Sequence, residues 1–322
     1  MSIKLNRTIL FLAKLLILVW VITFIYFKLN DIDNLDRKLF DQFIFVNRNN
    51  GSFALILPIL LMPINWLLEA IKWKILASKI QKIDLFQAYS GVLVGLSLSF
   101  ITPHGIGDYA GRIWSLNATN RNRLLGSILV GRWLQMLATL LFGTLGVYYL
   151  FPGCIALILI VSFIVLVIAL CLKPKVFINA LAGIFRSFSR LRVYRWISYY
   201  FSIIKDYTRL ELLTVGLLSV IRYCIFAFQF FWILTLFEVA LPADIKLAGV
   251  SWIFLAKSIL PSFNFLSDLG IREFAAIQFF EQYAADNVDV IASSLFLWLI
   301  NILVPTLLGL IFVFKLRFIR AK

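Results

Sequence analysis

Long apolar runs separated by short polar or basic segments dominate the chain. About six of these runs are long enough to cross a bilayer as helices, because about 20 residues at a 1.5 Å rise match a hydrocarbon core of about 30 Å. The pattern therefore predicts an all-α polytopic membrane protein. The predicted full spans are residues 9–29, 53–76, 124–150, 154–172, 211–237 and 290–314.

Two further apolar segments stop at a proline. Residues 85–101 end just before Pro103, and residues 247–260 end just before Pro261. Proline ends a helix because it lacks an N–H donor and clashes with the preceding turn, whereas glycine permits a tight turn. We predict that each segment turns back as a re-entrant helical hairpin, with ordinary hairpins and extra full spans as the open alternative. The expected hinge and turn residues are Pro103, Gly105, Gly107, Pro261 and Gly270.

The composition narrows the class of protein. Hydrophobic residues make up 62% of the 322 residues and charged residues 15%, whereas soluble domains contain about 45–50% and about 25%. This composition excludes a soluble enzyme, a nucleic-acid-binding module and a disordered protein. The net charge of +15 is typical of a membrane protein with Lys and Arg at cytoplasmic helix ends near anionic lipids. We expect anionic membrane lipids as partners, and no nucleic acid.

The distribution of Lys and Arg predicts the orientation. Residues 173–209 are rich in both, so we predict a basic cytoplasmic linker there. Working outward from this linker places both termini in the cytoplasm and gives the two halves opposite orientations. Residues 53–150 and 211–314 would then form an inverted repeat within a single membrane domain, residues 1–322. Inverted repeats with broken helices are typical of many transporters.

Several charged residues lie inside the predicted spans or hairpins. Each costs about 3 kcal/mol on insertion scales, so such residues usually face a cavity or a partner. Asn65, Glu69 and Lys72 share one helical stripe. Asp108 and Arg112 are four residues apart, so they can pair, or Arg112 and the helix N-terminus can receive an anionic headgroup. Arg222 lies deep in its span.

Other polar residues allow more than one interpretation. Arg132 and Gln135 extend the polar set, but Arg132 is close enough to a helix end to snorkel toward the headgroups. Arg272 and Glu273 belong to the second hairpin, where Lys257 could lie at a solvated rim.

Catalytic and metal chemistry find little support in the sequence. His104 is the only histidine, and the three cysteines lie in apolar runs without a CxxC pair. No P-loop pattern is present. We therefore expect no metal, no cofactor and no enzymatic activity.

Three short motifs carry a family pattern. They are Asn65-x3-Glu69-x2-Lys72-Trp73, Pro103-x-Gly105-x-Gly107-Asp108-x3-Arg112 and Leu269-Gly270-x-Arg272-Glu273. In order and spacing they resemble the lysylphosphatidylglycerol synthase transmembrane region, also called the flippase-like domain, over roughly residues 5–315. Asp108 stands where the family pattern has glutamate, and Ser267-Asp268 stand where it has a glycine pair, which leaves the headgroup specificity open.

The resemblance implies a bacterial or archaeal inner-membrane protein that moves lipid between leaflets. The chain ends at Lys322, so we expect no aminoacyl transferase domain of the kind that the best-known family member carries. We expect a translocase for a phospholipid or polyprenyl-phosphate headgroup. The alternatives are a scaffold for a separately encoded lipid-modifying enzyme, or an intramembrane lipid transferase. The expected substrate-binding residues are Asn65, Glu69, Lys72, His104, Asp108, Arg112, Arg222, Arg272 and Glu273.

Overall fold

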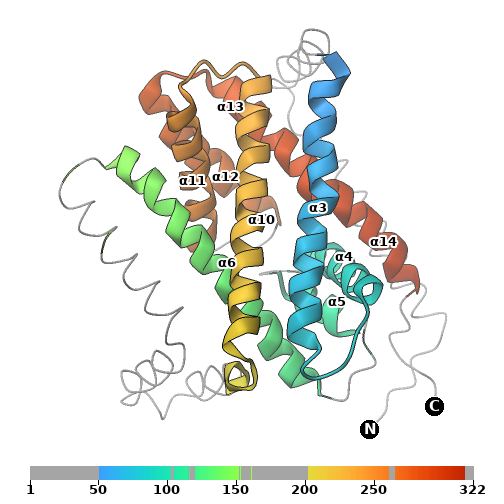
Figure 1. Ribbon diagram of the computed structural model, residues 1–322. Coiled ribbons are helices and arrows are strands. Elements are labelled where there is room, and N and C mark those ends of the chain that lie inside the picture. The colour runs from blue at the N-terminus through green and yellow to red at the C-terminus, as the bar shows by residue number, and fades with distance from the viewer. Residues whose placement is uncertain are drawn as a thin grey trace.

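The structure is a computed structural model, and its regular elements are all helices within the described residues (Figure 1). It describes residues 51–102, 105–114, 116, 120–151, 153, 161, 202–260 and 265–315. The α-helices are α3 (Gly51–Ala77), α4 (Leu85–Ile101), α5 (Ile106–Trp114), α6 (Arg121–Leu150), α10 (Arg209–Leu236), α11 (Ala243–Ile259), α12 (Phe265–Phe280), α13 (Asn287–Trp298) and α14 (Val304–Lys315). The π-helical turn Leu299–Leu303 joins α13 to α14.

Four helical stretches in the described residues are long and apolar enough to span a membrane. They are α3, α6, α10 and the continuous stretch α13–α14, and they correspond to four of the six predicted spans. The predicted spans 9–29 and 154–172 lie outside the described residues, as do nearly all of the linker 173–209 and both chain termini.

The two proline-terminated segments form helices close to their predicted bounds. Residues 85–101 form α4, and residues 247–260 correspond to α11. α4 begins at the end of the bundle where α3 stops. α11 begins at the opposite end of the bundle, beside the last turn of α6 (Figure 1). A shorter partner follows each helix, α5 after α4 and α12 after α11. Pro103 and Pro261 themselves lie outside the described residues.

Glycines bring α4 and α5 into close contact. A Cβ atom added to Gly107 would lie 2.1 Å from the backbone carbonyl carbon of Leu98, and one added to Gly111 would lie 2.5 Å from the Cα of Gly95. Gly105, in the turn, has a φ of +64°, a conformation that glycine adopts without strain. The Thr102 side chain stabilises this turn because its Oγ1 accepts a 2.6 Å hydrogen bond from the Gly107 N–H.

Side chains of α10 donate hydrogen bonds to α3 around Pro58. Pro58 cannot donate to the carbonyl of Ala54, and Trp232 of α10 donates to that carbonyl instead, at 3.1 Å. Gln229 of the same helix donates to the Pro58 carbonyl at 2.8 Å. These bonds hold α10 along α3.

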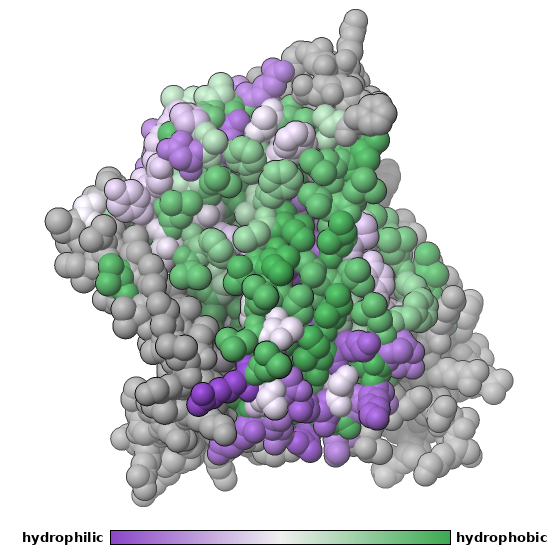
Figure 2. All heavy atoms as spheres, in the orientation of Figure 1, coloured by the Kyte–Doolittle hydropathy of each residue, from purple (hydrophilic) through white to green (hydrophobic). Residues whose placement is uncertain are grey.

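The surface separates into an apolar belt and two polar ends (Figure 2). Leu60 of α3 and Leu217 of α10 are about 60% exposed, as lipid-facing side chains are. The bundle end where α3 stops and α10 starts is basic, and the other end is acidic. The basic end carries Lys74, Lys79, Lys82, Arg121, Arg123, Lys205 and Arg209. The other end carries Glu238, Asp244, Glu281, Asp286 and Asp289, with Lys246. The fold is therefore that of an integral membrane protein.

We predict that Gly107→Ala destabilises the protein by about 3 kcal/mol or more, because backbone atoms of α4 occupy the space of the new methyl group. Thermal unfolding of the purified protein in detergent measures this loss. Gly216→Ala is the matched control, since nothing lies within 4 Å of its Cβ position. A Gly107→Ala variant as stable as Gly216→Ala would contradict the packing of the hairpin.

Candidate functional site

Glu69 of α3 lies at the centre of a buried set of ion pairs. Its Oε1 accepts a 2.9 Å hydrogen bond from Arg112 of α5, and its Oε2 accepts one of 3.1 Å from Lys72. Arg222 of α10 approaches the same Oε2 at 3.6 Å. One carboxylate thus contacts cations from three helices, and it is only 8% exposed.

Asp108 of α5 is the second carboxylate of this set. Its Oδ1 accepts a 2.8 Å bond from Nε of Arg112, the predicted pairing, and its Oδ2 accepts a 2.8 Å bond from Nη2 of Arg132. Arg112 therefore bridges Glu69 and Asp108. We call these residues the ionic cluster: Glu69, Lys72, Asp108, Arg112, Arg132 and Arg222.

Gln135 of α6 connects the ionic cluster to α10. Its Oε1 accepts a 2.9 Å bond from Lys72 and a longer one of 3.4 Å from Arg222, while its Nε2 donates to the Ser219 carbonyl at 3.1 Å. Because a carbonyl oxygen can only accept a hydrogen bond, the amide nitrogen of Gln135 must face Ser219, which leaves the amide oxygen facing the cations.

Arg222 makes the longest polar contacts of the four cations in the ionic cluster. Its nearest polar contacts are 3.4 and 3.6 Å long, and its buried Nε has no hydrogen-bond partner among the described residues. Its guanidinium lies over the rings of Trp66 and Phe226, at 5.2 and 5.7 Å. Aromatic faces hold the group in place without using its N–H donors, so these remain for a ligand.

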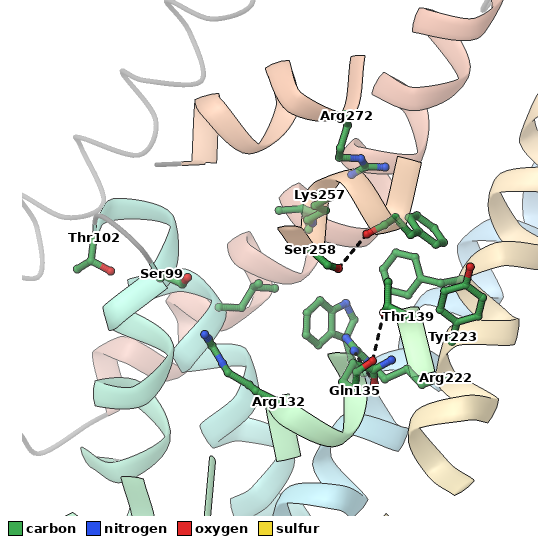
Figure 3. Close-up of a pocket in the computed structure, with 16 residues that line it drawn as sticks. Ser99, Thr102, Arg132, Gln135, Thr139, Arg222, Tyr223, Lys257, Ser258 and Arg272 are labelled. Atoms are coloured by element: carbon green, nitrogen blue, oxygen red, sulfur yellow. Dashed lines mark hydrogen bonds between the residues drawn. The ribbon is translucent and has the colours of Figure 1, made fainter. Parts of the chain in front are cut away.

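A cavity of about 410 Å³ opens beside the ionic cluster and is lined from both halves of the chain. Figure 3 shows Arg132 and Gln135 of α6 and Arg222 of α10 on one side, with Lys257, Ser258 and Arg272 of α11 and α12 opposite. Ser99 of α4 and Thr102, the residue after that helix, lie at a third side. A second cavity of about 370 Å³ shares Arg132 and Arg222 and extends to Glu69, Asp108 and Arg112. The first cavity is therefore a cation-rich chamber in contact with the ionic cluster.

The local sequence explains why these side chains reach the interior. Glu69 and Lys72 share the face of α3 that Trp66 and Trp73 also bury. The short helix α5 is held against α4 by its glycines, which places Asp108 and Arg112 next to α3 and α6.

Of the nine expected substrate-binding residues, five line one or both cavities. Asn65 is fully buried, but it lines neither cavity and neither of its amide atoms has a hydrogen-bond partner among the described residues. Lys72 contributes through its bonds to Glu69 and Gln135, and Glu273 is half-buried outside both linings. His104 lies outside the described residues. The five lining residues are Glu69, Asp108, Arg112, Arg222 and Arg272.

The expected hinge residues differ in their surroundings. Gly105 lines the first cavity and Gly107 packs against α4, while Gly270 is exposed with open space around its Cβ position. Among the described residues, Gly270 therefore has no close backbone approach of the kind seen at Gly107.

Sequence reasoning left several cavity residues out of the site. Arg132 was open to a snorkelling role, but its side chain reaches the cavity and also lies 4.3 Å from the ring centre of Tyr109. Lys257 lines the cavity, where the sequence suggested a solvated rim. Ser99, Thr102 and Ser258 carry no signal in a single sequence that separates them from ordinary small polar residues of membrane helices.

In the part of the chain that the structure describes, no group of three His, Cys, Asp or Glu side chains gathers.

Helices long enough to span a membrane, arranged around a cation-rich cavity, define an integral membrane protein with a polar site between its helices. The family model described as the lysylphosphatidylglycerol synthase TM region matches residues 11–309, and the chain belongs to this family. The family suggests a function related to membrane lipids. A search of curated proteins finds no match.

We predict that Glu69→Gln destabilises the protein by about 3–5 kcal/mol, because Lys72, Arg112 and Arg222 would lose their shared counter-charge. Unfolding measurements in detergent test this. Glu211→Gln, which breaks a half-exposed pair with Lys79, is the control and should cost less than about 1 kcal/mol. Equal effects of the two variants would show that the three cations do not depend on the negative charge of Glu69 for stability.

Proposed function

We propose that the protein is a lipid translocase that passes a phosphate-bearing headgroup through the bilayer while the hydrocarbon chains stay in lipid. The observation that carries this proposal is the first cavity, in which Arg132, Arg222, Lys257 and Arg272 face a space of about 410 Å³. Arginine is well suited to phosphate because its planar guanidinium can donate two parallel hydrogen bonds.

The ionic cluster supports this proposal by presenting Arg222 ready for an anion. Building such a site inside a bilayer is costly, so cations there usually serve a substrate pathway. Arg112 is held by two carboxylate bonds of 2.8 and 2.9 Å, whereas the contacts of Arg222 are longer. A phosphate can therefore bind Arg222 without displacing the bonds that join α3 to α5.

The helix contacts support an inverted repeat. When α3 is matched with α10, α4 with α11, α5 with α12 and α6 with α13–α14, contacts in one half have counterparts in the other. α3 contacts α4 and α6, as α10 contacts α11 and α13. α4 packs on α14, as α11 packs on α6, and α5 contacts α6, as α12 contacts α13. A two-fold relation of this kind suits a site that alternates between two membrane faces.

The helix lengths support re-entrant hairpins. At a 1.5 Å rise, α4 and α11 measure about 25 Å and α5 about 13 Å, which is short of a bilayer core of about 30 Å. The two hairpins start at opposite ends, and both contribute to the lining of the first cavity. Ser99 and Thr102 line it from the first hairpin, and Lys257 and Ser258 line it from the second. We propose that each hairpin closes the path from one side.

The charge asymmetry supports placing the basic end in the cytoplasm of a bacterial or archaeal plasma membrane. Arg123 pairs with Asp206 and Lys79 with Glu211 at this end, yet cations remain in excess there. We propose that both chain termini lie on the same side.

We propose no chemical reaction for the site. A general acid or base must exchange its proton with substrate, whereas Glu69 and Asp108 each accept hydrogen bonds from two cationic side chains. These carboxylates suit the role of holding cations in place.

A transport assay with purified protein in liposomes tests the proposed function. Lipids with a fluorophore in the acyl chain are exposed to a membrane-impermeant reductant, and translocation appears as loss of the protected inner-leaflet signal. We predict that Arg222→Gln lowers the protein-dependent rate by at least about tenfold, because a charge-assisted hydrogen bond contributes about 1.5–3 kcal/mol.

Arg123→Gln is the matched control for this assay, because it removes an arginine from an exposed pair at the basic end. It should keep the rate of the unmodified protein. The absence of protein-dependent translocation for every lipid, from folded protein, would refute the proposed function.

Cysteine labelling tests the proposed topology. With Cys154, Cys171 and Cys224 replaced by Ser, Lys82→Cys and Asn120→Cys should react with an impermeant reagent from the cytoplasmic face only. Ala243→Cys and Gln282→Cys should react from the opposite face only, because they flank the second hairpin. Labelling of all four positions from one face would contradict the inverted orientation.

A further inference from the structure

The charges of the ionic cluster do not balance. Lys72, Arg112, Arg132 and Arg222 contribute four cations, whereas Glu69 and Asp108 contribute two carboxylates. The described members of the ionic cluster thus carry an excess of two positive charges. A net positive charge inside a membrane protein is costly, so a ligand that brings negative charge is favoured.

Neither carboxylate of the ionic cluster is open to a positively charged ligand. Glu69 contacts three cations at 2.9, 3.1 and 3.6 Å, and both oxygens of Asp108 accept bonds of 2.8 Å. Among the described residues that line the first cavity, four are cationic and none is acidic. An ammonium group entering the cavity would therefore meet repulsion and would find no acceptor carboxylate on its described walls.

We propose that the headgroup bound here carries two or more negative charges and no ammonium group, as in a phosphate monoester or a diphosphate attached to a lipid chain. This inference rests on the proposed function and names its substrate class. A dianionic headgroup balances the excess charge of the ionic cluster. A monoanionic phosphodiester balances half of it, and a cationic aminoacylated headgroup increases it.

Arg132 and Arg222 are the residues placed to hold the phosphate. They line both cavities, from α6 and α10, and their side chains are 41% and 14% exposed, more than the 7% of Arg112. The hydroxyl of Ser99 lies on a facing wall and can donate to a further phosphate oxygen (Figure 3). The hydroxyl of Ser258 donates to the Phe254 carbonyl at 2.8 Å. The volume of about 410 Å³ is within the range of small-ligand pockets and leaves room for a second phosphate.

A binding series with headgroups of different charge tests the inference on the full chain in detergent. The probes are dioctanoyl phosphatidate, dioctanoyl phosphatidylglycerol and its lysyl ester, together with farnesyl phosphate and farnesyl diphosphate. Affinity is measured from the shift in thermal unfolding with probe concentration. We expect phosphatidate or the farnesyl phosphates to bind about tenfold more tightly than phosphatidylglycerol, and the lysyl ester to bind most weakly.

The two dianionic sources are distinguished within this series. Tighter binding of phosphatidate indicates a glycerolipid, and tighter binding of the farnesyl compounds indicates a polyprenyl carrier. Either outcome supports the inference. Binding of phosphatidylglycerol or its lysyl ester as tightly as the dianionic probes would overturn it.

Two substitutions at Arg222 separate charge from folding. Arg222→Gln should reduce the preference for phosphatidate over phosphatidylglycerol by about tenfold, whereas Arg222→Lys, which keeps the charge, should retain most of it. Arg123→Gln should leave the preference unchanged. An unchanged preference in folded Arg222→Gln would also overturn the inference.

The binding series and the transport assay fail independently. A preference for dianionic probes without translocation of any lipid refutes the translocase and leaves the headgroup class intact. Translocation without a charge preference refutes the headgroup class and leaves the translocase intact.

Discussion

The arrangement of the bundle depends on two carboxylates that keep four cations inside a membrane protein. Glu69 and Asp108 bring together α3, α5, α6 and α10, because the cations they hold come from all four helices. A buried ion pair gains little over apolar packing, but removal of one partner is strongly destabilising. These pairs therefore act less as a source of stability than as a restraint on where each helix can lie.

Close packing makes this restraint possible for a helix as short as α5. In lipid, association of helices relies on van der Waals contact and small residues, since lipid tails are as apolar as the side chains they replace. Gly107 and Gly111 let α5 lie directly on α4, and Gly309 gives α14 the same close approach to Leu93. These contacts hold Asp108 at the depth where Arg112 can reach Glu69.

The sequence was informative where the signal was local. Run lengths and prolines predicted the bounds of α4 and four spans to within a few residues, and helical periodicity predicted the Asp108–Arg112 pair. The position of Arg132 could not be predicted in this way, because its partner Asp108 is on another helix and snorkelling satisfies the same local pattern. Asn65 was predicted to belong to the site because it shares the helical stripe of Glu69, but it lies outside both cavity linings.

The guanidinium groups of Arg112 and Arg222 differ in how fully they are hydrogen-bonded, and this difference supports the proposed transport. Arg112 is held by two short carboxylate bonds and joins α5 to α3, so its displacement would disrupt the hairpin. Arg222 is supported mainly by the faces of Trp66 and Phe226, which fix its plane and leave N–H donors for a ligand. A headgroup can therefore gain and lose Arg222 at little structural cost. A transport site needs this property, because a ligand held as tightly as Arg112 is held would not be released at the far leaflet.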